Sequence, residues 1–243
     1  LAKEATTIDV LSKGRLELGL GSGWMKEEFD KAGLEFGTPA ERIRKLDEAL
    51  TILDRLMRGE TVDFDGEFYQ INGLEGTPRP RQGPRPPIAV GGGGPKMLAL
   101  AAKHADIISV ATGTTKDGKL RLSDMTIEKT VERVDRIRQA AGERFDEIEL
   151  NWTIATIVIT DDREATAEMA LKALAQGYPP NIAQDVELTV DDILSSPYLA
   201  FGSFEEIAEQ IREVRRRTTM SYVGVFPTQM DAFAPVIPLL REE

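Results

Sequence analysis

The chain has 243 residues, of which 41% are hydrophobic and 29% charged, enough for one large α/β domain but not for two. Its net charge of −11 argues against nucleic acid as a partner, because phosphate backbones are bound through Lys and Arg. Cysteine is absent and histidine occurs once, which excludes disulfides, thiolate nucleophiles and Cys-based zinc sites, and we expect no metal site.

The chain opens with a helical pattern of apolar residues over 1–11, which ends at Gly14, a residue suited to the left-handed conformation at helix ends. Residues 15–20 then alternate leucine with polar or small residues, as a strand does. This strand leads into Gly21-Ser22-Gly23-Trp24, a turn that few side chains could follow. We therefore predict a loop at the carboxyl end of a strand.

A long amphipathic helix is predicted over 40–58, where apolar residues recur at spacings of three and four. Residues 59–87 contain Asp65-Gly66, a hairpin signal, and then a proline-rich stretch, so we expect an excursion outside the main fold. Residues 87–90 are short, apolar and bounded by proline and glycine, which indicates a buried parallel strand. The run Gly91-Gly92-Gly93-Gly94 follows directly.

The second half of the chain continues the alternation of short apolar runs with amphipathic segments. His104 lies near the end of a predicted helix, and we interpret it as a helix C-terminal residue. The polar stretch 177–200 is interpreted as a lid or an insertion. Ser203 and Glu206 fit a capping box. The remaining predicted strands are 107–110, 148–159 and 221–226, and the remaining predicted helices are 96–104, 124–141, 163–176, 203–217 and 231–240.

The chain therefore shows about five βα units, the pattern of a parallel α/β fold. Its apolar runs fall short of the ~20 residues that a membrane helix requires. The opening segment lacks the apolar stretch of a secretory signal. We expect a cytoplasmic protein with no membrane partner.

A glycine run between a buried strand and a helix can bring successive N–H groups close to an anion, with help from the helix dipole. Phosphate is the expected ligand of Gly91 to Gly94, and Lys96 adds a positive charge in the first helical turn. A tight strand-to-helix turn without a ligand explains the same glycines equally well. The spacing matches neither a Walker loop nor the usual dinucleotide fingerprint.

The wider sequence resembles a known family. Residues 2–24 closely resemble the part of luciferase-like oxidoreductases that runs from the third barrel helix through the fourth strand. The resemblance continues through 42–50, 86–92 and 100–106, and more loosely at 201–206. Nearly the whole chain is covered.

This resemblance implies an α/β fold, a TIM (β/α)8 barrel of the luciferase-like type, with its cofactor at the carboxyl ends of the strands. The sequence is most similar to the branch that uses coenzyme F420, although FMN-dependent members share most motifs. The implied function is hydride transfer on a small-molecule substrate with F420, and the alternative is an FMN-dependent monooxygenase. The residues expected to bind the cofactor are Gly21, Ser22, Gly23, Trp24, Gly91, Gly92, Gly93, Gly94 and Lys96.

The sequence departs from the family in two respects. Family members have three further βα units before the segment that matches Leu1, and we expect these units to be missing here. Some also carry an acidic residue where this chain has Trp24. Glu27, Glu28 and Asp30 follow this position, but they fit the polar face of a helix as well as they fit a catalytic acid or base. No catalytic residue is therefore predicted.

An incomplete barrel would expose the edges of its sheet, so we expect self-association, most simply a dimer. A third hypothesis, from another class of function, is a non-catalytic barrel fragment that acts in assembly.

Overall fold

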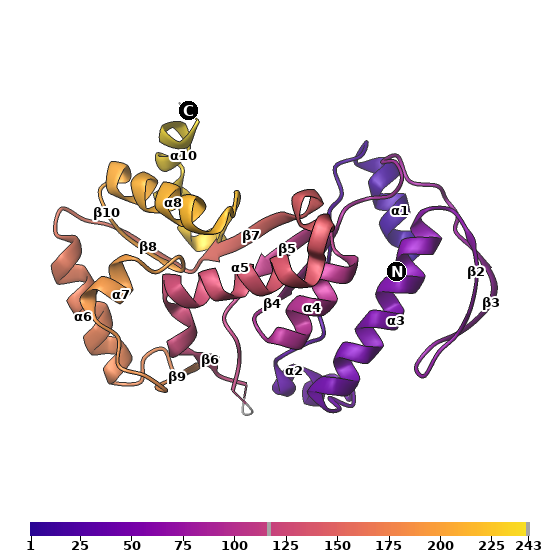
Figure 1. Ribbon diagram of the computed structural model, residues 1–243, viewed down its shortest axis with the longest axis horizontal. Helices are drawn as coiled ribbons and strands as arrows, with labels where there is room; N and C mark the ends of the chain where they lie inside the picture. The colour runs from indigo at the N-terminus through magenta and orange to yellow at the C-terminus, as the bar shows by residue number, and fades with distance from the viewer. Residues whose placement is uncertain (116–117, 242–243) are drawn as a thin grey trace.

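The computed structural model describes residues 1–115 and 118–241, and a parallel sheet of five strands lies at its centre (Figure 1). The strands are β1 (Leu18–Leu20), β4 (Ile88–Gly92), β5 (Ile107–Val110), β7 (Glu149–Ile154) and β11 (Tyr222–Val225). Their order in the sheet follows the order in the chain, and all neighbours are parallel. These strands lie in the five apolar runs, so the prediction of a parallel α/β fold is confirmed.

Helices follow the strands as βα units require. The longer helices are α1 (Ala2–Leu11), α3 (Pro39–Met57), α4 (Pro95–His104), α5 (Ile127–Ala141), α6 (Arg163–Ala175) and α8 (Phe204–Thr218). The short ones are α2 (Lys26–Lys31), α7 (Val190–Leu194), α9 (Met230–Phe233), α10 (Val236–Leu240) and the 3-10 turns η1 (Leu122–Met125), η2 (Gly142–Glu147) and η3 (Pro227–Gln229). The predicted capping box is confirmed: Ser203 Oγ accepts from Glu206 N–H at 3.2 Å, and the Glu206 carboxylate accepts from Ser203 N–H at 2.8 Å.

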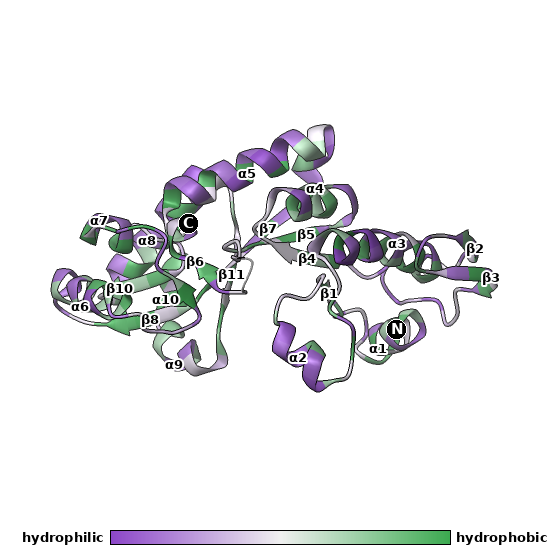
Figure 2. Ribbon diagram, turned by 90° about the horizontal axis from the view of Figure 1, so that it is seen from below, coloured by the Kyte–Doolittle hydropathy of each residue, from purple (hydrophilic) through white to green (hydrophobic). Residues whose placement is uncertain are grey.

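The main core lies between one face of the sheet and its helices. Val90, Ile108 and Trp152 point to this face and are almost fully buried, together with Leu98 of α4 and Val134 of α5. Figure 2 shows α4 and α5 lying along the same side of the strands. Because side chains alternate along a strand, the residues between these positions face the other way. We call that second side the open face.

A hairpin lies outside the main sheet, beside α3 (Figure 1). Its strands are β2 (Thr61–Asp65) and β3 (Gln70–Glu75), which pair antiparallel as a separate two-stranded sheet. The turn begins at Asp65-Gly66, where the hairpin signal predicts it, and Gly66 N–H donates to Tyr69 O at 2.9 Å. The hairpin occupies part of 59–87, and the role of this segment as an excursion outside a barrel stays a prediction.

The prediction of one strand over 148–159 is wrong. The strand β7 ends at Ile154, and a different strand, β8 (Thr156–Ile159), pairs with β10 (Leu199–Gly202) in its own sheet. The break has a local cause, because Ala155 N–H donates to Tyr198 O at 2.8 Å and turns the chain toward β10. The strand β10 was not predicted, because its first two residues lie in the stretch 177–200 that the sequence analysis interprets as a lid or an insertion.

The segment 177–200 contains little regular structure before β10. The strand β9 (Ile182–Ala183) pairs with β6 (Leu120–Arg121), and α7 follows. Side chains of this region pack into a second core with Ala167 of α6 and Phe201 of β10. A role as a lid stays a prediction.

Two buried charged side chains fix the chain segment that leads into β4. Asp9 is fully buried, and its Oδ2 accepts from the N–H groups of Arg81 at 2.6 Å and Gln82 at 2.9 Å. Arg85 lies between Asp54 and Asp106, at 2.5 Å from each carboxylate. The proline-rich segment is thereby held against α1 and α3.

The helix α1 buries only part of its apolar surface. Ala5 is buried, whereas Ile8 and Leu11 are 52% and 76% exposed. A groove of about 580 Å³ runs between this helix and the start of β1, where it is lined by Ile8, Leu16 and Leu18. Within the described residues, β1 pairs with β4 alone.

Candidate cofactor-binding site

Three loops meet at the carboxyl ends of β1, β4 and β5, which are neighbours in the sheet. The backbone at Gly93 packs directly against the loop that follows β5, at Ala111 and Thr112. That same loop approaches the first one, since a Cβ at Gly118 would lie 3.7 Å from Trp24 O. The structure therefore brings both predicted glycine loops to one edge of the sheet.

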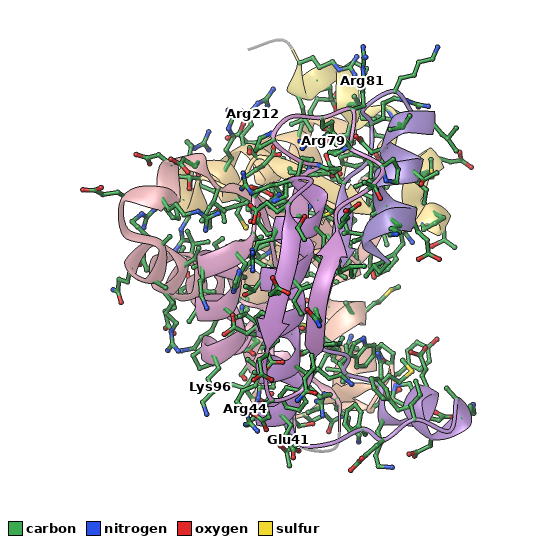
Figure 3. All side chains as sticks on the ribbon, turned by 90° about the vertical axis from the view of Figure 1, so that its right-hand side faces the viewer. Glu41, Arg44, Arg79, Arg81, Lys96 and Arg212 are labelled. Atoms are coloured by element: carbon green, nitrogen blue, oxygen red, sulfur yellow. The ribbon has the colours of Figure 1, made fainter. Side chains whose placement is uncertain are left out.

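The glycine run joins β4 to α4. Gly91 and Gly92 end the strand, and Gly94 is the N-cap residue of the helix, with extended φ and ψ of −81° and 148°. The first amides of a helix have no partner inside the helix, so they can bind an anion here. Lys96 is exposed in the first turn of α4 and lies at the same end of the molecule as Glu41 and Arg44, near the start of α3 (Figure 3).

Packing requires glycine at some positions of this run and not at others. A side chain at Gly92 would overlap Met97, and one at Gly93 would overlap the backbone of Ala111. These two positions are explained by packing alone. Gly94 has open space where a Cβ would point and an ordinary φ, so neither packing nor backbone conformation requires glycine there. A ligand that approaches the backbone closely would account for glycine at this position.

In the loop after β1, structure requires glycine at one position and not at another. Gly23 has a φ of +75° and the ring of Phe29 beside it, so its backbone conformation and packing both demand glycine. A Cβ at Gly21 would meet nothing within 4 Å, and Ser22 is half-buried. Trp24 is 46% exposed, which excludes a core role for its ring.

The acidic residues that follow this loop belong to the solvent face of α2. Glu27 pairs with Lys31 at 2.6 Å, and Asp30 pairs with Lys26 at 2.6 Å, each one helical turn apart. Glu28 is also exposed. Their arrangement is that of a polar helix face.

His104 ends α4, as predicted. Its Nε2 lies 2.5 Å from Asp47 Oδ1 on α3, and burial lowers the pKa of the imidazole although Asp47 opposes this shift. The contact joins α4 to α3.

A row of polar side chains on the open face escaped the sequence analysis. Ser109 Oγ donates to Asn151 Oδ1 at 2.7 Å, and Asn151 Nδ2 donates to Tyr222 O at 3.0 Å. Tyr222 Oη in turn donates to Glu17 Oε2 at 3.3 Å. The carboxylate of Glu17 raises the pKa of Tyr222, and partial burial adds to the effect. The available signal was the polar residue at every second position of β7, at Glu149, Asn151 and Thr153.

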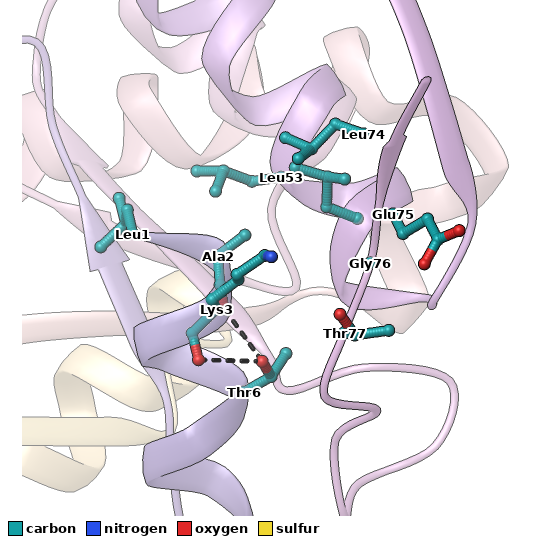
Figure 4. A pocket seen from close by; sticks show the side chains of 10 residues that line it. Leu1, Ala2, Lys3, Thr6, Leu53, Leu74, Glu75, Gly76 and Thr77 are labelled. Atoms are coloured by element: carbon teal, nitrogen blue, oxygen red, sulfur yellow. Dashed lines mark hydrogen bonds between the residues drawn. The ribbon is translucent and has the colours of Figure 1, made fainter. Parts of the chain in front are cut away.

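Another cavity, of about 330 Å³, lies between α1, α3 and the end of β3 (Figure 4). Its lining is mainly apolar and includes Leu1, Leu53 and Leu74, but no residue of the glycine loops. Over residues 1–115 and 118–241, no group of three or more His, Asp or Glu side chains could hold a metal ion. In the same residues, no helix has the length and apolar character to cross a membrane.

Comparison with known proteins finds one matching family model, that of luciferase-like monooxygenases, over residues 1–221. A 5,10-methylenetetrahydromethanopterin reductase of Archaeoglobus fulgidus is 30% identical over 193 residues, which are 77% of this chain and 52% of that protein. An FMNH2-dependent dimethylsulfone monooxygenase of Pseudomonas putida is 28% identical over 173 residues, 71% of this chain and 45% of that protein. The chain spans about half the length of these relatives.

Solved structures show the same fold. An F420-dependent secondary alcohol dehydrogenase in complex with an F420-acetone adduct matches with a TM-score of 0.70 at 18% identity. The match covers 99% of this chain and 74% of that structure. At this identity the likeness establishes the fold alone.

Proposed function

The chain belongs to the luciferase-like monooxygenase family, and from this premise we propose that it is an oxidoreductase that transfers hydride to or from a small organic substrate, with coenzyme F420 as cofactor. Members of the family act as oxidoreductases and monooxygenases with a flavin or a deazaflavin. The bound ring supplies the hydride chemistry, and the protein binds and orients it and excludes water.

The open position at Gly94 carries the proposal. This residue caps α4, its φ is ordinary, and the space beyond it is free, so a phosphate can approach the first amides of the helix. Gly21 leaves similar space on the neighbouring loop. Gly92 and Gly93 shape the turn, and Lys96 adds a positive charge nearby.

F420 is our first choice and FMN the alternative. A structural neighbour that carries an F420 adduct supports the first, and a relative whose name specifies reduced FMN supports the second. Titration of the purified chain with each compound decides between them. Binding of neither at ~100 μM would favour a non-catalytic barrel fragment that acts in assembly.

Substitution of Gly94 separates a ligand site from a simple turn. Gly94→Ala places a methyl group where the phosphate would bind, so we expect at least a tenfold loss of cofactor affinity with less than ~1 kcal/mol lost in stability. Gly83→Ala is the matched control, because its Cβ would also enter open space, but in the proline-rich segment. Equal cofactor affinity in both variants would reduce the glycine run to a turn.

The five-stranded sheet fits part of a larger barrel. We propose that it represents five of the eight strands of a luciferase-like barrel, and that the other three come from outside these 243 residues. Support comes from the apolar surface of α1 and the unpaired edge of β1 in the described part of the chain. A chain of this length is expected to cover that surface by self-association, most simply as a dimer.

A further inference from the structure

Four residues form one row across the open face of the sheet. The registers pair Gly91 with Ser109, Ser109 with Asn151, and Asn151 with Tyr222. Their neighbours Val90 and Ile108 point into the helix-covered core, so this row points the other way. The row runs from the glycine loop at the carboxyl end of β4 down to the first residue of β11.

The hydrogen bonds within the row fix which way each group points. Tyr222 O is a carbonyl and can only accept, so the amide nitrogen of Asn151 must face it, at 3.0 Å. The amide oxygen then faces Ser109 Oγ, at 2.7 Å, and receives its single proton. Toward the open face, the hydroxyl of Ser109 therefore offers lone pairs and no proton.

Gly91 keeps this hydroxyl accessible. A Cβ at position 91 would lie 3.5 Å from Ser109 Cβ, so any larger side chain would pack against Ser109. The φ of Gly91 lies outside the left-handed region, and no closer contact excludes a side chain there. Neither backbone conformation nor packing thus requires glycine, and the missing side chain leaves Ser109 uncovered on the side of β4.

We propose that Ser109 accepts a hydrogen bond from a hydroxyl group of the ribityl chain of the bound cofactor. This inference rests on the proposed function. The ribityl chain joins phosphate to ring in both F420 and FMN, and Ser109 lies one strand away from the glycine loop that would hold the phosphate. Because the Ser109 hydroxyl can only accept a hydrogen bond on this side, its ligand partner must be a donor. In both cofactors, the ribityl hydroxyls are the donors that lie next to the phosphate. Asn151 acts as a positioning residue, because it orients the Ser109 proton away from the ligand.

The test compares ligands that differ in the ribityl chain. FMN, riboflavin and lumiflavin share the ring, but only the first two carry the ribityl hydroxyls, and only FMN carries the phosphate. F420 and the phosphate-free deazaflavin that keeps the ribityl chain form the corresponding deazaflavin pair. Binding to the wild type, Ser109→Ala and Gly91→Ala is measured by fluorescence titration, with Ser195→Ala on the exposed end of α7 as control.

Loss of one neutral hydrogen bond predicts a ~3- to 10-fold weaker affinity of Ser109→Ala for FMN, riboflavin and the F420 pair, with lumiflavin unchanged. Gly91→Ala should show the same pattern, and both variants should melt as the wild type does. An unchanged affinity for all ligands, or an equal loss for lumiflavin, would overturn the role of Ser109 while the proposed function stands. If the wild type binds none of these compounds, both proposals fail.

Discussion

The phenol of Tyr222 donates a hydrogen bond to the carboxylate of Glu17, with 3.3 Å between Oη and Oε2. Tyr222 begins β11 and Glu17 directly precedes β1, and these two strands are the opposite edges of the five-stranded sheet. A flat sheet would hold its edges far apart. The twist and tilt of the strands therefore curve the sheet until side chains from its two edges meet, as in part of a barrel.

This bridge makes the titration of Tyr222 sensitive to Glu17. The carboxylate raises the pKa of Tyr222 above its ordinary value of 10.0, because a tyrosinate would be repelled. Glu17→Gln can still accept the hydrogen bond, and we expect it to lower this pKa toward 10.0. The phenolate absorbance of the four tyrosines, compared with that of Tyr222→Phe, measures the change.

The sign of the linked stability effect follows from the same shift. Since the pKa of Tyr222 is raised in the folded state, the bridge contributes fully below pH 10.0 and is lost as the pH rises through the folded value. Wild type should therefore lose more stability in alkali than Glu17→Gln. Identical phenolate titrations of the two proteins would contradict the assignment.

Gly93 and Gly94 are adjacent glycines with opposite expected behaviour. A side chain at Gly93 would overlap the backbone of Ala111, which cannot move aside as a flexible side chain can. We expect Gly93→Ala to lower the free energy of unfolding by ~1–3 kcal/mol. Urea unfolding measures this value, and Gly94→Ala, with open space, is the matched control. Equal stability of both variants would show that the loop after β5 is not packed as described.

Arg85 neutralises the charges of two carboxylates, so its replacement should lower the free energy of unfolding. Asp54 and Asp106 are 30% and 39% exposed, so water replaces part of the missing ion pairs. We therefore expect Arg85→Met to lose ~2–3 kcal/mol, at or just below the lower end of the range for broken buried pairs. Arg58→Met, which removes an exposed partner of Asp54, should lose less than ~1 kcal/mol.

The loss of stability at low pH, the acid limb of a plot of stability against pH, tests the same contact. Burial raises the pKa of Asp54, but hydrogen bonds from Arg58 and Arg85 outweigh it, and the net shift is downward. The corresponding stability is present above pH 3.8 and is lost as the pH falls through the folded pKa. Arg85→Met should weaken this loss, and an unchanged acid limb would contradict the role of Arg85.

Asp9 should fix the proline-rich segment through backbone hydrogen bonds. In Asp9→Asn an amide can place its NH2 group against the N–H groups of Arg81 and Gln82, which leaves donors unpaired. The expected loss is ~1–3 kcal/mol, with faster hydrogen exchange at these two amides. Asp30→Asn, on the exposed face of α2, serves as control. Unchanged exchange at both amides would show that the segment is held by other contacts.

The sequence predicted where each strand of the main sheet lies, because each is a short run of apolar or alternating residues, such as 107–110, although it extended β7 too far. It also predicted the cap at Ser203, which depends on residues three positions apart. It missed the break at Ala155, because the bond from Ala155 N–H to Tyr198 O joins residues far apart in the chain. The orientation of Ser109 was beyond reach for the same reason, since Asn151 and Tyr222 determine it.

The exposed surface of α1 predicts the behaviour of the chain in solution. Ile8 and Leu11 are exposed, and Ile8 lines the groove that leads to Leu18 on β1, an edge strand in the described sheet. Apolar side chains next to an unpaired strand edge favour association. We expect a mass above the 26.8 kDa monomer by light scattering, and a return to monomer when Ile8 and Leu11 are both replaced by Glu.

A control for this experiment must expose an equally large apolar side chain elsewhere. Met169 on α6 is 66% exposed and lies away from α1 and β1, so Met169→Glu should leave the mass unchanged. A stable monomer of the wild-type chain at micromolar concentration would contradict self-association. Loss of association in Met169→Glu, with none in the Ile8 and Leu11 variant, would move the interface from α1 to α6.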